Sequence, residues 1–68
     1  MKYVVVIEKG ADSWGVYVPD LPGCAVVAAT REEALQLIRE AVDLHIEGLR
    51  EAGGPIPEAQ STIEYVQV

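Results

Sequence analysis

The sequence has few of the residues that several classes of protein require. Its only cysteine, Cys24, can form no disulfide within the chain and cannot build a cysteine-based zinc site. Its only histidine, His45, has no HExxH or Cys/His spacing around it. With 5 Lys and Arg against 11 Asp and Glu, the formal net charge is −6. A chain this acidic repels phosphate backbones and anionic membranes, so we expect neither nucleic acid nor a membrane as a partner.

Long apolar runs are also missing. The longest β-branched stretch, Val4–Ile7, is far too short to span a bilayer. We find no charged region followed by an apolar run and a cleavage site, the pattern of a signal peptide. Together with the lone cysteine, this predicts a cytoplasmic protein with a single domain, residues 1–68. Half of the residues are apolar, which is high for so small a surface and favours a homodimer or a higher homo-oligomer.

Three segments have the composition of strands. Residues 2–8 are β-branched and apolar on both faces, and residues 14–18 alternate, with Trp14, Val16 and Val18 on one face. The loop between them, residues 9–13, has the length of a hairpin connection. Residues 24–29 form a third segment with small side chains.

A helix follows, predicted from residue 31 to residue 52. Thr30 and Glu33 have the spacing of a capping box, in which each side chain pairs with the backbone amide of the other residue. Gly53, Gly54 and Pro55 then end the helix. The helix is amphipathic, with a wide apolar side. Its polar side includes the following residues: Glu32, Gln36, Glu40, Asp43 and Glu47.

Residues 62–68 alternate again, with Ile63 and Tyr65 on one face and Val66 and Val68 on the other. This predicts a closing strand and the order β-β-β-α-β. The corresponding fold class is α+β, a two-layer domain in which one helix covers one face of an antiparallel sheet. The opposite face would stay open as an interface.

The most distinctive stretch is residues 17–24, Tyr-Val-Pro-Asp-Leu-Pro-Gly-Cys. Pro19-Asp20 and Pro22-Gly23 are both turn dipeptides, so the chain must turn between two strands. A loop this rigid suits either a structural corner or a preformed contact surface. The turn does not require the side chains of Asp20 and Leu21, which are therefore candidates for a functional role.

Catalytic interpretations have little support in the residues. His45 and Cys24 lack the second group that a catalytic base or thiol needs, so both are interpreted as packing residues. Glu8, Asp12, Asp20 and Glu32 offer carboxylates for a metal-dependent phosphodiester hydrolysis, but their spacing matches no motif. We therefore expect no enzyme activity, no cofactor and no metal.

Three motifs taken together point to a family. The run Tyr17-Val18-Pro19-Asp20-Leu21-Pro22-Gly23-Cys24 is followed by Thr30-Arg31-Glu32-Glu33-Ala34-Leu35 and then by Gly54-Pro55-Ile56-Pro57. In this order and spacing they resemble the HicB-like antitoxin family, whose pattern is an aromatic strand ending in Pro-Asp-Leu-Pro-Gly-Cys and a helix starting with Thr-x-x-Glu-Ala. The match covers almost the whole chain.

The resemblance implies a partial ribonuclease-H-like domain that is not an enzyme. Such domains bind and neutralise a small basic toxin of the HicA type, an mRNA-cleaving protein with a double-stranded-RNA-binding-domain fold. Because we see no C-terminal DNA-binding segment, we expect no direct DNA binding. The residues expected to face a partner are the following: Asp20, Leu21, Glu32, Gln36, Glu40, Asp43 and Glu47. The alternative is a homo-oligomeric relative without a toxin, acting as a scaffold or small-ligand binder.

Overall fold

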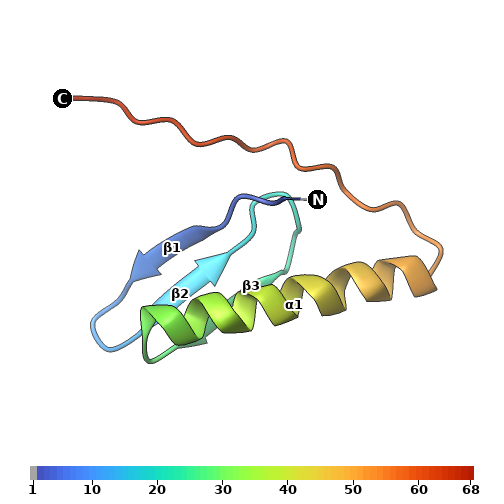
Figure 1. Ribbon diagram of the computed structural model, residues 1–68, viewed down its shortest axis with the longest axis horizontal. Helices are drawn as coiled ribbons and strands as arrows, with labels where there is room; N and C mark the ends of the chain where they lie inside the picture. Colours follow the sequence, from blue (N-terminus) through green and yellow to red (C-terminus); the bar gives the residue numbers. More distant parts are fainter. Residues whose placement is uncertain (1) are drawn as a thin grey trace.

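The computed structural model describes residues 2–68 and has three strands followed by one long helix (Figure 1). The elements are β1 (Val6–Lys9), β2 (Trp14–Tyr17), β3 (Ala25–Ala28) and α1 (Arg31–Glu51). The helix lies on one face of the sheet, which confirms the predicted two-layer α+β class. Each strand is shorter than predicted, whereas the helix differs from its predicted span by a single residue.

The sheet is an antiparallel meander with the order β1-β2-β3. Its register sets Ile7 opposite Val16 and Val16 opposite Val26, so these three residues share one face. Val6 and Tyr17 pair on the other face. A turn joins the first two strands, in which the Gly10 amide donates to the Ser13 carbonyl at 2.7 Å.

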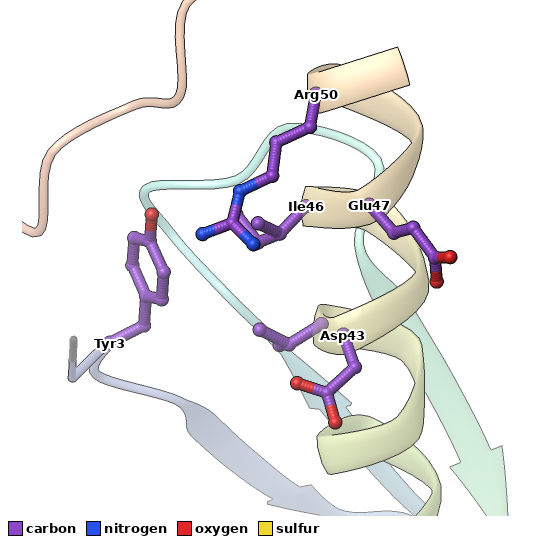
Figure 2. A pocket seen from close by; sticks show the side chains of 6 residues that line it. Tyr3, Asp43, Ile46, Glu47 and Arg50 are labelled. Atoms are coloured by element: carbon purple, nitrogen blue, oxygen red, sulfur yellow. The ribbon is translucent and has the colours of Figure 1, made fainter.

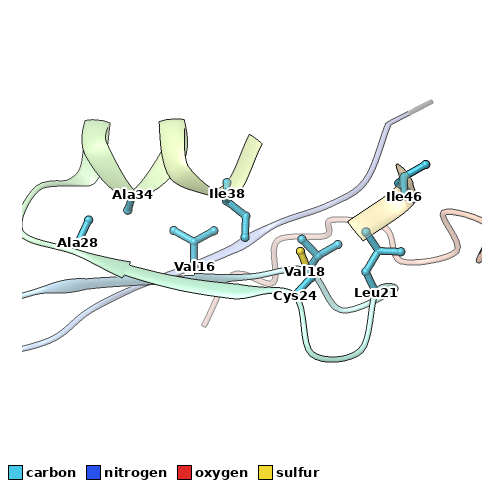
Figure 3. Close-up of a cluster of buried hydrophobic side chains, with 8 residues drawn as sticks. All are labelled: Val16, Val18, Leu21, Cys24, Ala28, Ala34, Ile38 and Ile46. Carbon is cyan, nitrogen blue, oxygen red and sulfur yellow. The ribbon is translucent and has the colours of Figure 1, made fainter. Parts of the chain in front are cut away.

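The helix covers the face that carries Val16. The buried core consists of apolar residues from this face, from the loop after β2 and from the helix (Figure 3): Val16, Val18, Leu21, Cys24, Ala28, Ala34, Ile38 and Ile46. Ile38 and Ala34 pack over Val16, while Ile46 lies above the loop end of the sheet. The period-2 pattern of the sheet and the 3.6-residue period of the helix thus meet in one apolar layer.

Both ends of α1 are capped, although only one of the two bonds of the predicted capping box is present among residues 2–68. The Thr30 hydroxyl accepts a hydrogen bond from the Glu33 amide at 3.1 Å, with Thr30 in extended conformation. At the other end Gly53 takes a φ of +72°. The Gly53 amide donates to the Arg50 carbonyl and the Gly54 amide to the Leu49 carbonyl, the two bonds of a Schellman motif.

The predicted closing strand is wrong for this structure. Residues 62–68 have no secondary structure and run as an extended segment away from the body of the domain (Figure 1). Alternation of apolar residues is a local property, but a strand also needs backbone pairing with a neighbour, and residues 62–68 make no backbone hydrogen bond within the described chain. The side chains of Ile63, Tyr65, Val66 and Val68 are therefore exposed.

The helix leaves one edge of the sheet open. Among residues 2–68, the backbone of α1 packs against β3 and β2 and does not reach β1. The outer edge of β1 also lacks a neighbouring strand. Ile7 and the preceding Val5 are consequently only half-buried.

Candidate interaction surface

The loop between β2 and β3 consists of two consecutive tight turns. The Leu21 amide donates to the Val18 carbonyl, and the Cys24 amide donates to the Leu21 carbonyl, each at 3.1 Å. A third bond of 3.1 Å from the Val18 amide to the Cys24 carbonyl closes the loop at its base. Gly23 has a φ of +83°, as the third position of a type II turn requires after a proline. The loop is therefore preformed by its own backbone.

Leu21 does not face a partner in this structure. Its side chain is fully buried, at 0% exposure, and is among the largest such side chains in the described part of the chain. The position between two turns predicts exposure, but the double turn points this side chain back under Ile46 and into the core. Leu21 is thus a core residue, which corrects the expectation that it is part of a contact surface.

Asp20, the neighbour of Leu21, binds the chain's own C-terminal segment. Its Oδ2 accepts hydrogen bonds from the amides of Gln60 at 3.0 Å and Ser61 at 2.9 Å, and its Oδ1 accepts from the Ser61 hydroxyl at 2.9 Å. The Ser61 amide in particular lowers the pKa of the Asp20 carboxyl, because it stabilises the ionised form. Both carboxylate oxygens are engaged, so Asp20 acts here as an anchor.

A second tie lies close by. The Tyr3 hydroxyl donates to the Pro57 carbonyl at 2.5 Å, which joins the approach to β1 to the segment that follows the helix. Tyr3, Pro57 and Ser61 are all half-buried. Residues 57–61 are therefore held against the domain at two points, and the exposed segment begins immediately afterwards.

The helix residues expected to face a partner, four acids and Gln36, form one stripe along α1. Glu32, Gln36, Glu40, Asp43 and Glu47 follow one another at steps of four, four, three and four residues, so they share one face of the helix. All five are exposed. Gln36 donates to Glu40 at 3.3 Å within the stripe. We call these five residues the acidic stripe.

A groove runs beside the acidic stripe, between α1 and the approach to β1. Tyr3 forms one wall, and Ile46 and Arg50 form the other, with the Arg50 guanidinium directed toward Tyr3 (Figure 2). Toward the start of the helix, the groove continues past Val5 and Leu35. Its larger section has a volume of about 540 Å³. Asp43 and Glu47 belong to both features, so the acidic stripe and the groove form one continuous surface.

The residues weighed for catalysis were Cys24, His45 and four carboxylates. Within residues 2–68, no three His, Cys, Asp or Glu side chains gather closely enough to hold a metal ion. Cys24 is buried, and this burial raises the pKa of its thiol. His45 is half-buried on the helix. In the same described region, no helix is long and apolar enough to cross a membrane.

Sequence reasoning missed the groove and the Asp20 anchor. The groove depends on the helix covering two of three strands, which no local pattern reveals. The anchor joins residues 41 positions apart. Its one available signal was an aspartate in a turn that does not need its side chain.

Comparison with known proteins agrees with the motifs. Residues 3–68 match the family described as HicB_like antitoxin of bacterial toxin-antitoxin system. An uncharacterized 14.9 kDa protein of Haemophilus phage HP1 is 38% identical over 66 residues, covering 97% of this chain and 50% of the phage protein. A UPF0150 protein of Thermoplasma acidophilum is 45% identical over 58 residues, 84% of each chain.

One relative carries a functional name. Antitoxin HicB 2 of Photorhabdus laumondii is 32% identical over 68 residues, covering 94% of this chain and 49% of that protein. The chain thus spans about half the length of this relative and of the phage protein. No solved structure matches the chain significantly. With the family pattern matched over nearly its whole length, the chain belongs to the HicB-like antitoxin family.

Proposed function

We propose that this domain binds and neutralises a small basic, mRNA-cleaving toxin of the HicA type by covering its active surface. The observation that carries the proposal is the acidic stripe, whose five residues are all exposed on one side of α1. A toxin that cleaves RNA presents a basic surface to its substrate, and such a surface is complementary to the stripe. The family membership and the name of the Photorhabdus relative support this direction.

The mechanism is occlusion and needs no cofactor and no reaction by the antitoxin itself. Carboxylates on a straight helix approach the toxin's Lys and Arg side chains as the RNA phosphates would. Asp20 is committed to Gln60 and Ser61, so we place the partner on the helix side and not at the loop. Both proteins would act in the cytoplasm, where mRNA is found.

The test is isothermal titration against a small basic protein encoded next to this one. Glu40, Asp43 and Glu47 are replaced together by lysine, and binding is expected to weaken by about 100-fold or more, since three attractive contacts become repulsive. The matched control replaces Glu8, Asp12 and Glu58, three exposed acids outside the stripe, and changes the net charge equally. Equal weakening in both variants, or no binding by the unmodified protein, contradicts the proposal.

Self-association is the second proposal for the function. It is favoured by a specific observation, four exposed large apolar side chains within residues 62–68. A homo-oligomer without a toxin, acting as a scaffold or small-ligand binder, would show such an assembly and no binding in the titration above. Toxin binding by the acidic stripe does not require self-association, so the two proposals are tested separately.

A further inference from the structure

Residues 62–68 have the sequence of a strand and the exposure of an unpaired one. Tyr65, Val66 and Val68 are 89%, 83% and 118% exposed, and Ile63 is 64% exposed. Within residues 2–68, none of the backbone groups of this segment makes a hydrogen bond to another backbone group. Contiguous apolar surface of this kind on a small protein indicates a binding site. We call residues 62–68 the tail.

The point from which the tail leaves is fixed. Asp20 holds the amides of Gln60 and Ser61, and Tyr3 holds the Pro57 carbonyl. Ser61 makes the last of these hydrogen bonds, and the tail begins at the next residue. From there the tail extends away from the sheet and past the body of the domain (Figure 1). An anchored, extended segment loses less conformational entropy on binding than a free one.

The same chain also carries an unfilled place for a strand. The outer edge of β1 has no neighbour in the sheet, and α1 does not cover that side. Val5 and Ile7 are half-buried there, and the groove between Val5 and Leu35 lies beside the residues that lead into β1. A strand added to the edge would pair its backbone with β1. One row of its side chains would then enter the groove.

The tail is exposed, and the β1 edge of the same chain is open. A second copy of the chain can pair with both, because it offers an open β1 edge to the tail and a tail to the open β1 edge. We propose that the tail of one copy adds a strand to the outer edge of β1 in a second copy, and that the exchange is reciprocal. The result is a two-fold symmetric, strand-exchanged homodimer. Ile63 and Tyr65, which share one face, enter the partner copy's groove. This inference goes beyond the binding of a toxin and does not depend on it.

Sedimentation of the purified chain without any partner tests the proposal. The unmodified protein is expected to be a dimer, and the double variant Ile63→Asp, Tyr65→Asp is expected to dissociate about 100-fold more readily, because two buried apolar side chains become charges. The control is Val27→Asp, Leu44→Asp, which changes two exposed apolar residues outside the tail. A monomeric unmodified protein overturns the proposal. So does a dimer that only the control variant disrupts, since that dimer uses the surface around Val27 or Leu44 and not the tail.

Crosslinking distinguishes exchange between copies from closure within one chain. In a Cys24→Ala background, Val6→Cys is combined in turn with Glu64→Cys, Val66→Cys or Val68→Cys, because alternate residues of the tail share the face of Val6 when Ile63 and Tyr65 point into the groove. At least one pair is expected to give a covalent dimer on oxidation. Its folding is checked by circular dichroism. A disulfide-linked monomer, or no crosslink with any of the three pairs, overturns the proposal.

Discussion

Asp20 and Ser61 lie 41 positions apart and are joined by two hydrogen bonds, one from the Ser61 amide and one from its hydroxyl. The first residue belongs to a loop between strands and the second to the segment after the helix. The pair therefore closes the domain around its core and sets the direction of everything that follows Ser61. Without it, the bond between Tyr3 and Pro57 and the packing of Ile56 against the core would hold that segment.

Replacing Asp20 by asparagine is expected to release residues 60 and 61. The neutral side chain retains a single acceptor oxygen, whereas the carboxylate uses both of its oxygens. Amide hydrogen exchange measured by NMR should show faster exchange at Gln60 and Ser61 and unchanged exchange in β2. Asp12→Asn, in the exposed turn before β2, is the control. Unaltered exchange at Ser61 in the Asp20 variant would contradict the anchoring role.

The same contact should respond to acid. The Ser61 amide lowers the pKa of Asp20 in the folded state, so the anchor's contribution is fully present above the pKa of an unfolded aspartate. It is lost as the pH falls through the lowered, folded-state value. The Ser61 amide chemical shift, followed by NMR against pH, should therefore change with a midpoint below the ordinary value of an aspartate. A midpoint at or above that value would mean that the bonds do not form in solution.

Leu21→Ala is expected to destabilise the domain by about 2–5 kcal/mol, since it empties a fully buried site in the core. Leu44→Ala removes the same atoms from a side chain that is 69% exposed, and should change the free energy of unfolding by less than about 0.5 kcal/mol. Urea unfolding followed by circular dichroism measures both. Similar losses in the two variants would show that Leu21 is not packed as described.

Replacing two of the glycines by alanine, one at a time, should change the stability of the domain in opposite directions. Gly23 has a φ of +83°, where a side chain is strained, so Gly23→Ala is expected to cost about 1–2 kcal/mol. Gly48 lies inside α1 with open space around its Cβ position. Gly48→Ala should therefore stabilise the domain by about 0.5–1 kcal/mol. The two midpoints of thermal unfolding should fall on either side of the unmodified value, and shifts of the same sign would contradict the local geometry.

Removing the helix cap is expected to cost about 1 kcal/mol. Thr30→Ala leaves the Glu33 amide without its side-chain acceptor. Thr30→Ser keeps the hydroxyl and should restore most of the loss. The measurement is the urea midpoint of the three proteins. If the serine variant is as unstable as the alanine variant, the methyl group of Thr30 and not its hydroxyl matters.

The sequence predicted best those features that arise within a few neighbouring residues. The cap at Thr30 and the glycines after Ala52 define α1 almost to the residue, because both signals are made by the backbone next to them. The double turn around Pro19 and Pro22 also follows from local chemistry. Trp14, Val16 and Val18 lie on the helix side of the sheet, as their alternation indicated.

The errors concern partners that are distant in the sequence. Residues 62–68 alternate like a strand, yet alternation does not say which edge would receive them. Leu21 lies between two turn dipeptides, and only the three-dimensional path of the double turn shows that it points inward. The carboxylate of Asp20 has no local motif that would connect it to Ser61. Tertiary context decides each of these cases.

The meander order of the sheet has a consequence for folding. Every strand pairs with its neighbour in the sequence, so the sheet forms by closing short loops, which is fast and costs little chain entropy. We expect β1, β2 and β3 to assemble within milliseconds or less, and during synthesis before α1 is complete. The contacts between Tyr3 and Pro57 and between Asp20 and Ser61 join residues 54 and 41 positions apart. They close much longer loops, so we expect them to form after the sheet.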